Sequence, residues 1–363
     1  MTADAVGGVW TYCLDLAGGL ASAGLETTLV VLGPSPSPDQ IVDAAAVPGL
    51  SLIDSGLPLD WTAAGPAEVA QAARTVQALA ADPGADLIHL NSPMLAADGG
   101  FSAPVLGACH SCLATWWSAV KTEPMPADFR WRTRMLWRGL HACDVLTAPT
   151  RAFARETSLA YDILAPKVVL NGRPSRNQAS IAARQPIVFT SGRLWDEGKN
   201  VAVLDRAAGL TRNLVYMAGP ASGPNGAAVD LSHARLLGRL SSDEIAGWLA
   251  RTTIYASGAR YEPFGLGVLE AALAGCSLVL SDIPSFRELW DGAAVFVDPD
   301  DAGGYAAAFD RLLGDQAELG RLAACARARS RRYTVTRMTN GILEAYRSIF
   351  PGIGATTTEA AIA

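Results

Sequence analysis

The stretch Tyr261-Glu-Pro-Phe-Gly-Leu-Gly-Val-Leu-Glu270 joins a strand-like run, 252–257, to a helix-like run that ends near Ala274. Gly265 and Gly267 leave the amides of the first helical turn bare, and bare amides at a helix N-terminus suit phosphate oxygens. Glu262 precedes the helix, and we expect Glu270 about two turns along it. The two carboxylates would each accept hydrogen bonds from hydroxyl groups of one ligand. The alternative is a capped amphipathic helix with one exposed glutamate.

Upstream, the segment Ser191-Gly-Arg-Leu-Trp-Asp-Glu-Gly-Lys199-Asn200 has the same strand–loop–helix context. Arg193 and Lys199 place two cations beside a helix N-terminus, which suits a diphosphate. The segment differs from a Walker A loop, because five residues separate its glycines and Asn200 stands where a Ser or Thr would hold magnesium. The alternative is a surface loop with solvated cations.

Short apolar strands alternate with helices along the whole chain, as in buried parallel sheets. Two successive series of this kind predict two doubly wound domains. The expected parts are an N-terminal domain over 1–172, a polar linker over 173–186, a C-terminal domain over 187–334, a helix over 335–350 that braces the first domain, and a disordered tail over 351–363.

Composition narrows the classes of function. The chain has 363 residues, 50% of them hydrophobic, with a net charge of −6 and a pI near 5.3. An acidic chain does not suit a nucleic-acid backbone. We find no signal peptide and no long apolar run, so we expect a cytoplasmic protein. The six cysteines are expected to be reduced, buried thiols. Cys109-His-Ser-Cys112 lacks the second ligand pair of a zinc site.

The motifs in this order resemble those of a retaining glycosyltransferase of family 4 with the GT-B fold. "EPFGLGVLE" is similar to that family's Glu-x7-Glu motif, and "GRLWDEGKN" to its phosphate loop. "VVLNG" at 168–172 resembles the end of its first domain, and "GGVW" at 7–10 its first glycine-rich loop. The resemblance covers nearly the whole chain. It implies two Rossmann-like domains that face a central cleft and a nucleotide-sugar donor.

The resemblance implies a role for each matching residue. Glu270 would bind the donor ribose and Glu262 the transferred sugar. Arg193 and Lys199 would neutralise the diphosphate. His110 would touch the donor sugar near its anomeric carbon, although a histidine at a strand end is also typical of a core. The remaining residues would contact the donor through their backbone: Gly7, Gly8, Arg239, Leu240, Phe264, Gly265 and Leu266.

No metal or other cofactor is expected, because cations and amides already face the leaving diphosphate. Asp298-Pro-Asp300 is formally the metal motif of the other glycosyltransferase fold. Its place between a strand and a helix favours Asp300 or Asp301 as a helix cap.

Two features of the first domain bear on its partners. Trp116 and Trp117 fit either stacking on a sugar acceptor or packing in the core. The basic, aromatic run 129–138 fits either contact with an anionic membrane or a helix with solvated arginines.

The family normally opens with a full first strand, so the opening Met-Thr-Ala-Asp4 predicts a truncated one.

Taken together, the sequence predicts a hexosyltransferase that uses a UDP- or GDP-sugar and a glycan or lipid-linked acceptor. Two rivals share the fold. A nucleotide-sugar epimerase or hydrolase would turn over the donor without an acceptor. A non-catalytic nucleotide-sugar-binding protein would never release a nucleoside diphosphate.

Overall fold

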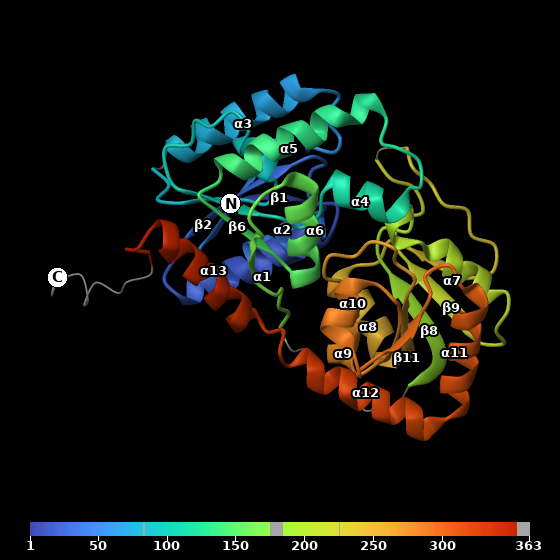
Figure 1. The fold of residues 1–363 in the computed structure, drawn as a ribbon. Helices are drawn as coiled ribbons and strands as arrows, with labels where there is room; N and C mark the ends of the chain where they lie inside the picture. Colours follow the sequence, from blue (N-terminus) through green and yellow to red (C-terminus); the bar gives the residue numbers. More distant parts are fainter. Residues whose placement is uncertain (83, 175–183, 225, 354–363) are drawn as a thin grey trace. The chain divides into compact units, whose positions relative to one another are not determined.

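The computed structural model describes residues 1–82, 84–174, 184–224 and 226–353. The chain divides into two compact units (Figure 1). Unit 1 comprises Met1–Gly172 together with the chain from Val335 onward, and unit 2 comprises Arg173–Thr334. Much of the predicted linker and most of the predicted tail lie outside the described residues.

Unit 2 is built on a parallel sheet with the strand order β10-β9-β8-β11-β12-β13. Its strands are β8 (Gln185–Ser191), β9 (Leu214–Ala218), β10 (Arg235–Gly238), β11 (Thr252–Ser257), β12 (Ser277–Ser281) and β13 (Val295–Val297). The chain winds outward in both directions from the neighbouring strands β8 and β11. Ligands of doubly wound sheets bind beyond the carboxyl ends of the strands at such a switch point.

Helices cover both faces of this sheet (Figure 1). They are α7 (Val201–Ala208), α8 (Ser242–Arg251), α9 (Leu266–Ala274), α10 (Pro284–Trp290), α11 (Ala302–Gly314) and α12 (Gln316–Ser330). Successive residues of a strand point to opposite faces. Val188 therefore joins the core formed with α7 and α11, whereas Phe189 stacks on Trp248 of α8 with ring centroids 5.7 Å apart.

Unit 1 holds parallel strands in two sheets, ordered β1-β2-β3 and β4-β5-β6-β7. The strands are β1 (Thr2–Asp4), β2 (Thr27–Leu32), β3 (Leu50–Asp54), β4 (Ile88–Leu90), β5 (Val105–Ala108), β6 (Val145–Ala148) and β7 (Lys167–Val168). The place of the first strand is filled, because β1 pairs with β2 over three positions. It is short, and Asn91 links it to the end of β4 by donating to the Thr2 carbonyl over 2.6 Å.

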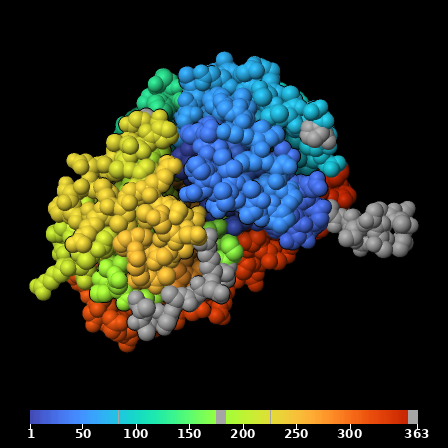
Figure 2. Space-filling model, turned by 180° about the vertical axis from the view of Figure 1, so that it is seen from behind, coloured from blue at the N-terminus to red at the C-terminus, as the bar shows by residue number. Residues whose placement is uncertain are grey.

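The helices of unit 1 come from both ends of the chain. They are α1 (Gly8–Ser22), α2 (Pro38–Ala45), α3 (Pro66–Ala81), α4 (Leu113–Val120), α5 (Arg130–Ala142), α6 (Arg151–Tyr161) and α13 (Val335–Ile349). The last helix, α13, lies beside α1 and shares its hydrophobic core (Figure 1). In the space-filling view, red surface from the end of the chain lies next to blue surface from its N-terminal part (Figure 2).

The predicted α/β class with parallel sheets is confirmed. The strand expected over 252–257 is β11, and the helix expected over 335–350 is α13. Four elements were not predicted: β3, α2, α4 and α10. In the described part of the chain, no helix is long and apolar enough to cross a membrane.

Candidate functional site

The loop after β8 carries the predicted phosphate-binding cations. Its backbone leaves the strand through Gly192, whose φ of +149° is unfavourable for other residues. The Arg193 guanidinium donates to the Asp196 carboxylate over 2.9 Å, and Asp196 also accepts from the Gly198 amide over 2.9 Å. The Nε of Arg193 is buried and takes no partner among the described residues.

Two backbone hydrogen bonds join this loop to the loop after β11. The Gly198 carbonyl accepts from the amides of Arg260 and Tyr261, over 2.9 and 3.2 Å. The Lys199 ammonium consequently meets the Glu262 carboxylate in a direct ion pair. Both side chains are partly buried, with 24% and 16% of their surface exposed. The structure therefore brings together Arg193, Lys199 and Glu262, which the sequence analysis derived from two separate motifs.

Asn200 fixes the junction of these loops, and the sequence analysis missed this role. Its backbone is left-handed, with φ of +48°, a conformation that asparagine tolerates better than most residues. Its side-chain amide donates to the Gly258 carbonyl over 2.9 Å and to the Pro299 carbonyl over 2.7 Å. One buried amide thus ties together the loops that follow β8, β11 and β13.

The start of α9 is shaped by glycine and by a buried phenol. Gly265 caps the helix with φ of +87°. A Cβ atom at Gly267 would lie 2.6 Å from the hydroxyl of Tyr255, so any other residue there would displace that ring. Burial raises the pKa of the Tyr255 phenol to about 12, and the negative charges of Glu270 and Glu262 add to the rise. Tyr255 therefore remains protonated beneath the first turn.

Glu270 lies closer to the helix start than expected. The helix begins at Leu266 and Glu262 stands in the preceding loop, so Glu270 is little more than one turn into α9. The prediction of two turns was wrong because it counted loop residues as helical. The Glu270 carboxylate pairs with the Nε of Arg173 over 2.9 Å.

The charges of this cluster are closely balanced. Burial alone would raise the pKa of the Asp196 carboxyl, but Arg193, Lys199 and hydrogen bonds outweigh burial and hold that pKa below its ordinary value. Arg193, Lys199 and Arg173 each face a carboxylate. Such an arrangement keeps cations ordered at the switch point of the sheet, where an entering anion competes with carboxylates for them.

Glycines lie along the carboxyl edge of the unit 2 sheet from the end of β8 to the end of β10. The Gly192 amide donates to the Ala218 carbonyl over 3.0 Å, and the Gly219 amide donates to the Gly238 carbonyl over 2.7 Å. Beyond Gly238 lie the exposed Arg239 and the half-buried Leu240. These two predicted donor-binding residues thus follow the strand at the edge of the sheet, two strands away from the cation cluster.

In unit 1, the predicted glycine loop follows β1 directly. The Asp4 carboxylate accepts from the amides of Val6 and Gly7, over 2.9 and 3.2 Å, and Gly7 caps α1. The short first strand therefore still delivers Gly7 and Gly8 to the carboxyl edge of its sheet.

His110 lies just beyond the end of β5. Its Nε2 is 2.7 Å from the side-chain oxygen of Asn91, which accepts the hydrogen bond, and its ring packs edge-on against Tyr12. Burial lowers the pKa of the His110 imidazole to about 4. Asn91 was not predicted as a site residue, although it also bonds to Thr2.

The remaining candidates of unit 1 have mixed surroundings. Trp116 and Trp117 are half-buried on α4, and Trp117 donates to the Glu123 carbonyl over 2.7 Å. One face of α5 exposes Trp137 among basic side chains. These basic side chains are Arg130, Arg134, Arg138 and His141.

Asp301 and the six cysteines were not assigned to the site from the sequence. Asp301 caps α11 by accepting from the Gly304 amide over 2.8 Å, which confirms the predicted cap. All six cysteines are free thiols, and three of them are buried. Among the described residues, no His, Cys, Asp and Glu side chains gather in a set that suits a metal ion.

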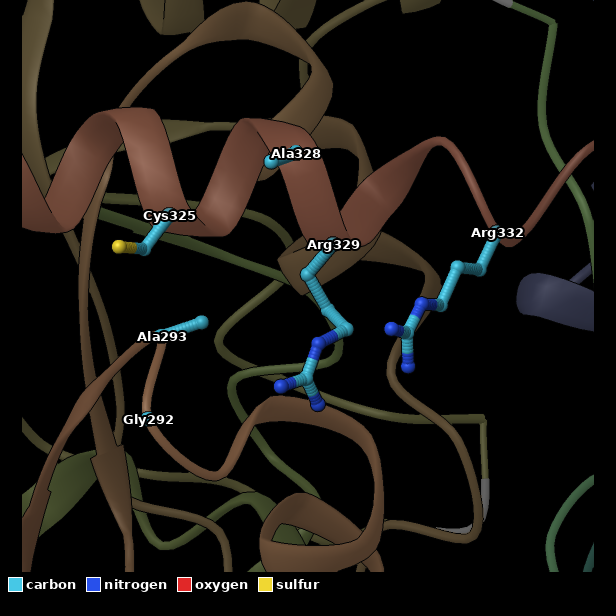
Figure 3. Close-up of a pocket in the computed structure, with 6 residues that line it drawn as sticks. All are labelled: Gly292, Ala293, Cys325, Ala328, Arg329 and Arg332. Atoms are coloured by element: carbon cyan, nitrogen blue, oxygen red, sulfur yellow. The ribbon is translucent and has the colours of Figure 1, made fainter.

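A hollow of about 250 Å³ lies elsewhere in unit 2, between α12 and the loop after α10 (Figure 3). Arg329 and Arg332 extend along one side of it, and Arg329 donates to the carbonyls of Leu289 and Asp291. None of the predicted site residues lines this hollow.

Comparison with known proteins gives two family matches. The model described as Glycosyltransferase Family 4 matches residues 6–173, and the model described as Glycosyl transferases group 1 matches residues 185–315. A 97-residue segment is 39% identical to the glycogen synthase of Mycobacterium tuberculosis. This segment is 26% of the present chain and only 23% of the length of that synthase.

Solved structures resemble nearly the whole chain. Sucrose-phosphate synthase from Thermosynechococcus elongatus is 18% identical with a TM-score of 0.74, covering 96% of this chain and 98% of that chain. Anabaena HepE in complex with UDP-glucose is also 18% identical, with a TM-score of 0.72 and coverage of 96% and 99%. At this identity the likeness establishes the fold.

Proposed function

This chain is a glycosyltransferase of the family 4, group 1 type with the GT-B fold, and we propose that it transfers a hexosyl unit with retention from a UDP- or GDP-sugar to a glycan or lipid-linked acceptor. The HepE structures contain UDP and UDP-glucose, which supports a UDP-sugar as the donor. The acceptor class rests on the resemblance stated above.

One observation carries this proposal: Arg193, Lys199 and Glu262 gather at the switch point of the unit 2 sheet. The reaction breaks the bond between the anomeric carbon and a diphosphate oxygen and forms a bond from that carbon to an acceptor hydroxyl oxygen. The electron pair leaves with the diphosphate. Ordered cations and bare amides aimed at this developing charge lower the barrier.

We assign the roles accordingly. Arg193 and Lys199 bind the diphosphate with amides of Phe264, Gly265 and Leu266. Glu262 holds hydroxyls of the transferred sugar.

Further roles complete the donor site. Glu270 holds the ribose, and the backbone at Arg239 and Leu240 seats the base. The departing phosphate takes the proton of the acceptor hydroxyl, so no carboxylate nucleophile is needed. We expect activity to persist in EDTA, since protein cations supply the positive charge.

Unit 1 contributes its own candidates to this proposal. We assign Gly7 and Gly8 to phosphate contacts and His110 to the donor sugar. His110 is neutral at physiological pH because its pKa is near 4, so it serves as a hydrogen-bond partner and not as a cation. Trp116 offers a half-buried ring for stacking on a sugar acceptor.

If the acceptor is bound to a membrane, we expect the exposed face of α5 to contact that membrane, because Trp137 lies there among arginines. Such a face suits anionic headgroups. Sedimentation with vesicles of anionic phospholipid tests this contact. Arg130→Glu combined with Arg134→Glu should abolish it, and vesicles of neutral lipid serve as the control.

The main test screens nucleotide sugars by thermal shift and then measures nucleoside diphosphate release with candidate acceptors. Arg193→Ala and Glu262→Ala should each reduce transfer at least about 100-fold, as loss of a charge-stabilising contact does. Arg287→Ala removes an exposed ion pair in the same unit and is the control.

Near-normal transfer by both Arg193→Ala and Glu262→Ala would contradict the assignment of the site. Donor turnover that needs no acceptor would instead support a hydrolase. Donor binding without any release of nucleoside diphosphate would contradict transfer.

A further inference from the structure

We propose that Arg173 is a positioning residue of the ribose site, which holds Glu270 in the orientation that binds the donor ribose. This inference rests on the proposed function of Glu270. Arg173 lies at the boundary where unit 2 begins, outside both motifs.

The ion pair between the two side chains is largely screened from water. The Nε of Arg173 lies 2.9 Å from the Oε1 of Glu270, and the exposed fractions of the side chains are 11% and 26%. The attraction between opposite charges is stronger where water is largely excluded. Exposed surface pairs, by contrast, hold their partners loosely.

The backbone of Arg173 is fixed by the segment that ends unit 2. The Arg173 amide donates to the Tyr333 carbonyl over 3.2 Å. Tyr333 is itself anchored, because its hydroxyl donates to the Leu289 carbonyl over 2.9 Å and its ring packs edge-on against Phe264. Phe264 directly precedes the cap of α9, so Arg173 is positioned relative to the helix that carries Glu270.

The chemistry of the pair suits a ribose diol. Both ribose hydroxyls donate, and an ionised carboxylate accepts with two oxygens. Arg173 faces one of these oxygens, Oε1. Among the described residues, Glu270 has no other side-chain partner. The second oxygen is therefore presented to ligand in one orientation.

The test compares ribonucleotides with analogues that lack the diol. Isothermal titration measures the dissociation constants of UDP, GDP and ADP, and then of the 2′,3′-dideoxy form of the tightest binder. The wild-type protein should favour the ribonucleotide by about tenfold or more, as expected for hydrogen bonds to a charged group. Arg173→Gln should reduce this preference to within about threefold, while the dideoxy form binds nearly as before.

Two further variants separate positioning from general damage. Arg173→Lys keeps the charge but not the planar geometry, and it should lose most of the preference. In a Glu270→Gln background, Arg173→Gln should have no additional effect, because Arg173 acts through Glu270. Arg287→Gln breaks an exposed ion pair of the same unit and should leave the preference unchanged.

The outcomes distinguish this inference from the function on which it rests. A wild-type protein that binds no nucleoside diphosphate, or an Arg193→Ala variant that binds as tightly as wild type, overturns the proposed donor site and this inference with it. If the donor site stands, an undiminished preference in Arg173→Gln overturns the role of Arg173 alone. An equal loss for both nucleotides would show a structural effect and also overturn it.

Discussion

The proposed donor site in unit 2 contains three ion pairs. Lys199 is paired with Glu262, Arg193 with Asp196, and Glu270 with Arg173. Removing one partner of a partly buried ion pair leaves the other charge uncompensated, which destabilises the folded protein. In the proposed complex, phosphate oxygens would take up Arg193 and Lys199, and sugar hydroxyls would satisfy Glu262. Arg173 would stay paired with Glu270.

His110 provides a pH-dependent test at the scale of one residue. The folded protein keeps this imidazole neutral down to about pH 4, whereas an unfolded chain protonates it near pH 6.5. Between these values the unfolded state binds more protons, so acidification lowers the free energy of unfolding. We expect His110→Gln to lessen the loss of stability between pH 7 and pH 5, measured by urea denaturation.

The control for this measurement is His141→Gln, on the exposed face of α5. His89 is buried more fully than His110, and burial also lowers its pKa, so part of the loss should remain in His110→Gln. An identical loss in His110→Gln and wild type would contradict the burial of this imidazole.

The site residues were predictable from the sequence where they belong to a short local motif. Arg193, Lys199, Glu262 and Glu270 belong to two short motifs. The structure places the first three on adjacent loops and Glu270 in α9. Asn200 was not predictable as a link, because its partner Pro299 lies 99 residues away. Arg173 and Asn91 were missed for the same reason, since only the folded chain brings their partners near.

At the scale of elements, the carboxyl edge of the unit 2 sheet depends on close backbone packing. A Cβ atom at Gly219 would lie 1.8 Å from the carbonyl oxygen of Gly192, and φ at Gly219 is +136°. No side chain fits between these loops without displacing the one that carries Arg193. The glycine row therefore sets the position of the phosphate loop relative to β9.

Gly219→Ala should consequently destabilise unit 2 by about 3 kcal/mol or more, since strain and overpacking act together. Donor binding should be lost as well. The matched control is Gly247→Ala, within α8, where an added Cβ meets nothing within 4 Å. This change should stabilise the protein by about 0.5–1 kcal/mol. Urea denaturation measures both, and equal effects would contradict the packing described.

The helices and strands that were not predicted have only weak or short patterns in the sequence. The strand β3 forms an edge and has no fully buried residue, so no apolar run marks it. The helix α10 spans only seven residues, too few for a clear helical period. The short β1 was expected to be truncated, and it is held by pairing with β2, a contact between strands that sequence alone does not reveal.

At the scale of the molecule, unit 1 is assembled from both ends of the chain. Met338, Ile342 and Leu343 of α13 are buried in one core with Trp10 and Leu16 of α1. The Tyr346 hydroxyl also lies 2.7 Å from the buried Nδ1 of His89. Residues 1–172 alone would leave this apolar surface exposed to water.

We therefore expect a fragment of residues 1–172 to lack a cooperative unfolding transition. The same fragment joined to residues 335–353 through a flexible linker should unfold cooperatively in urea, as followed by circular dichroism. A control fusion in which Ile342 and Leu343 are replaced by Asp should behave like the bare fragment. Cooperative unfolding of 1–172 alone would contradict the role of α13.

The most direct test of the account is a crystal structure of the protein with UDP-glucose, or with the nucleotide sugar that the screen selects. We predict diphosphate oxygens about 3 Å from the Arg193 guanidinium and the Lys199 ammonium, at the carboxyl ends of β8 and β11. A nucleotide bound with its diphosphate away from both cations, for example in the hollow beside Arg329 and Arg332, would contradict it.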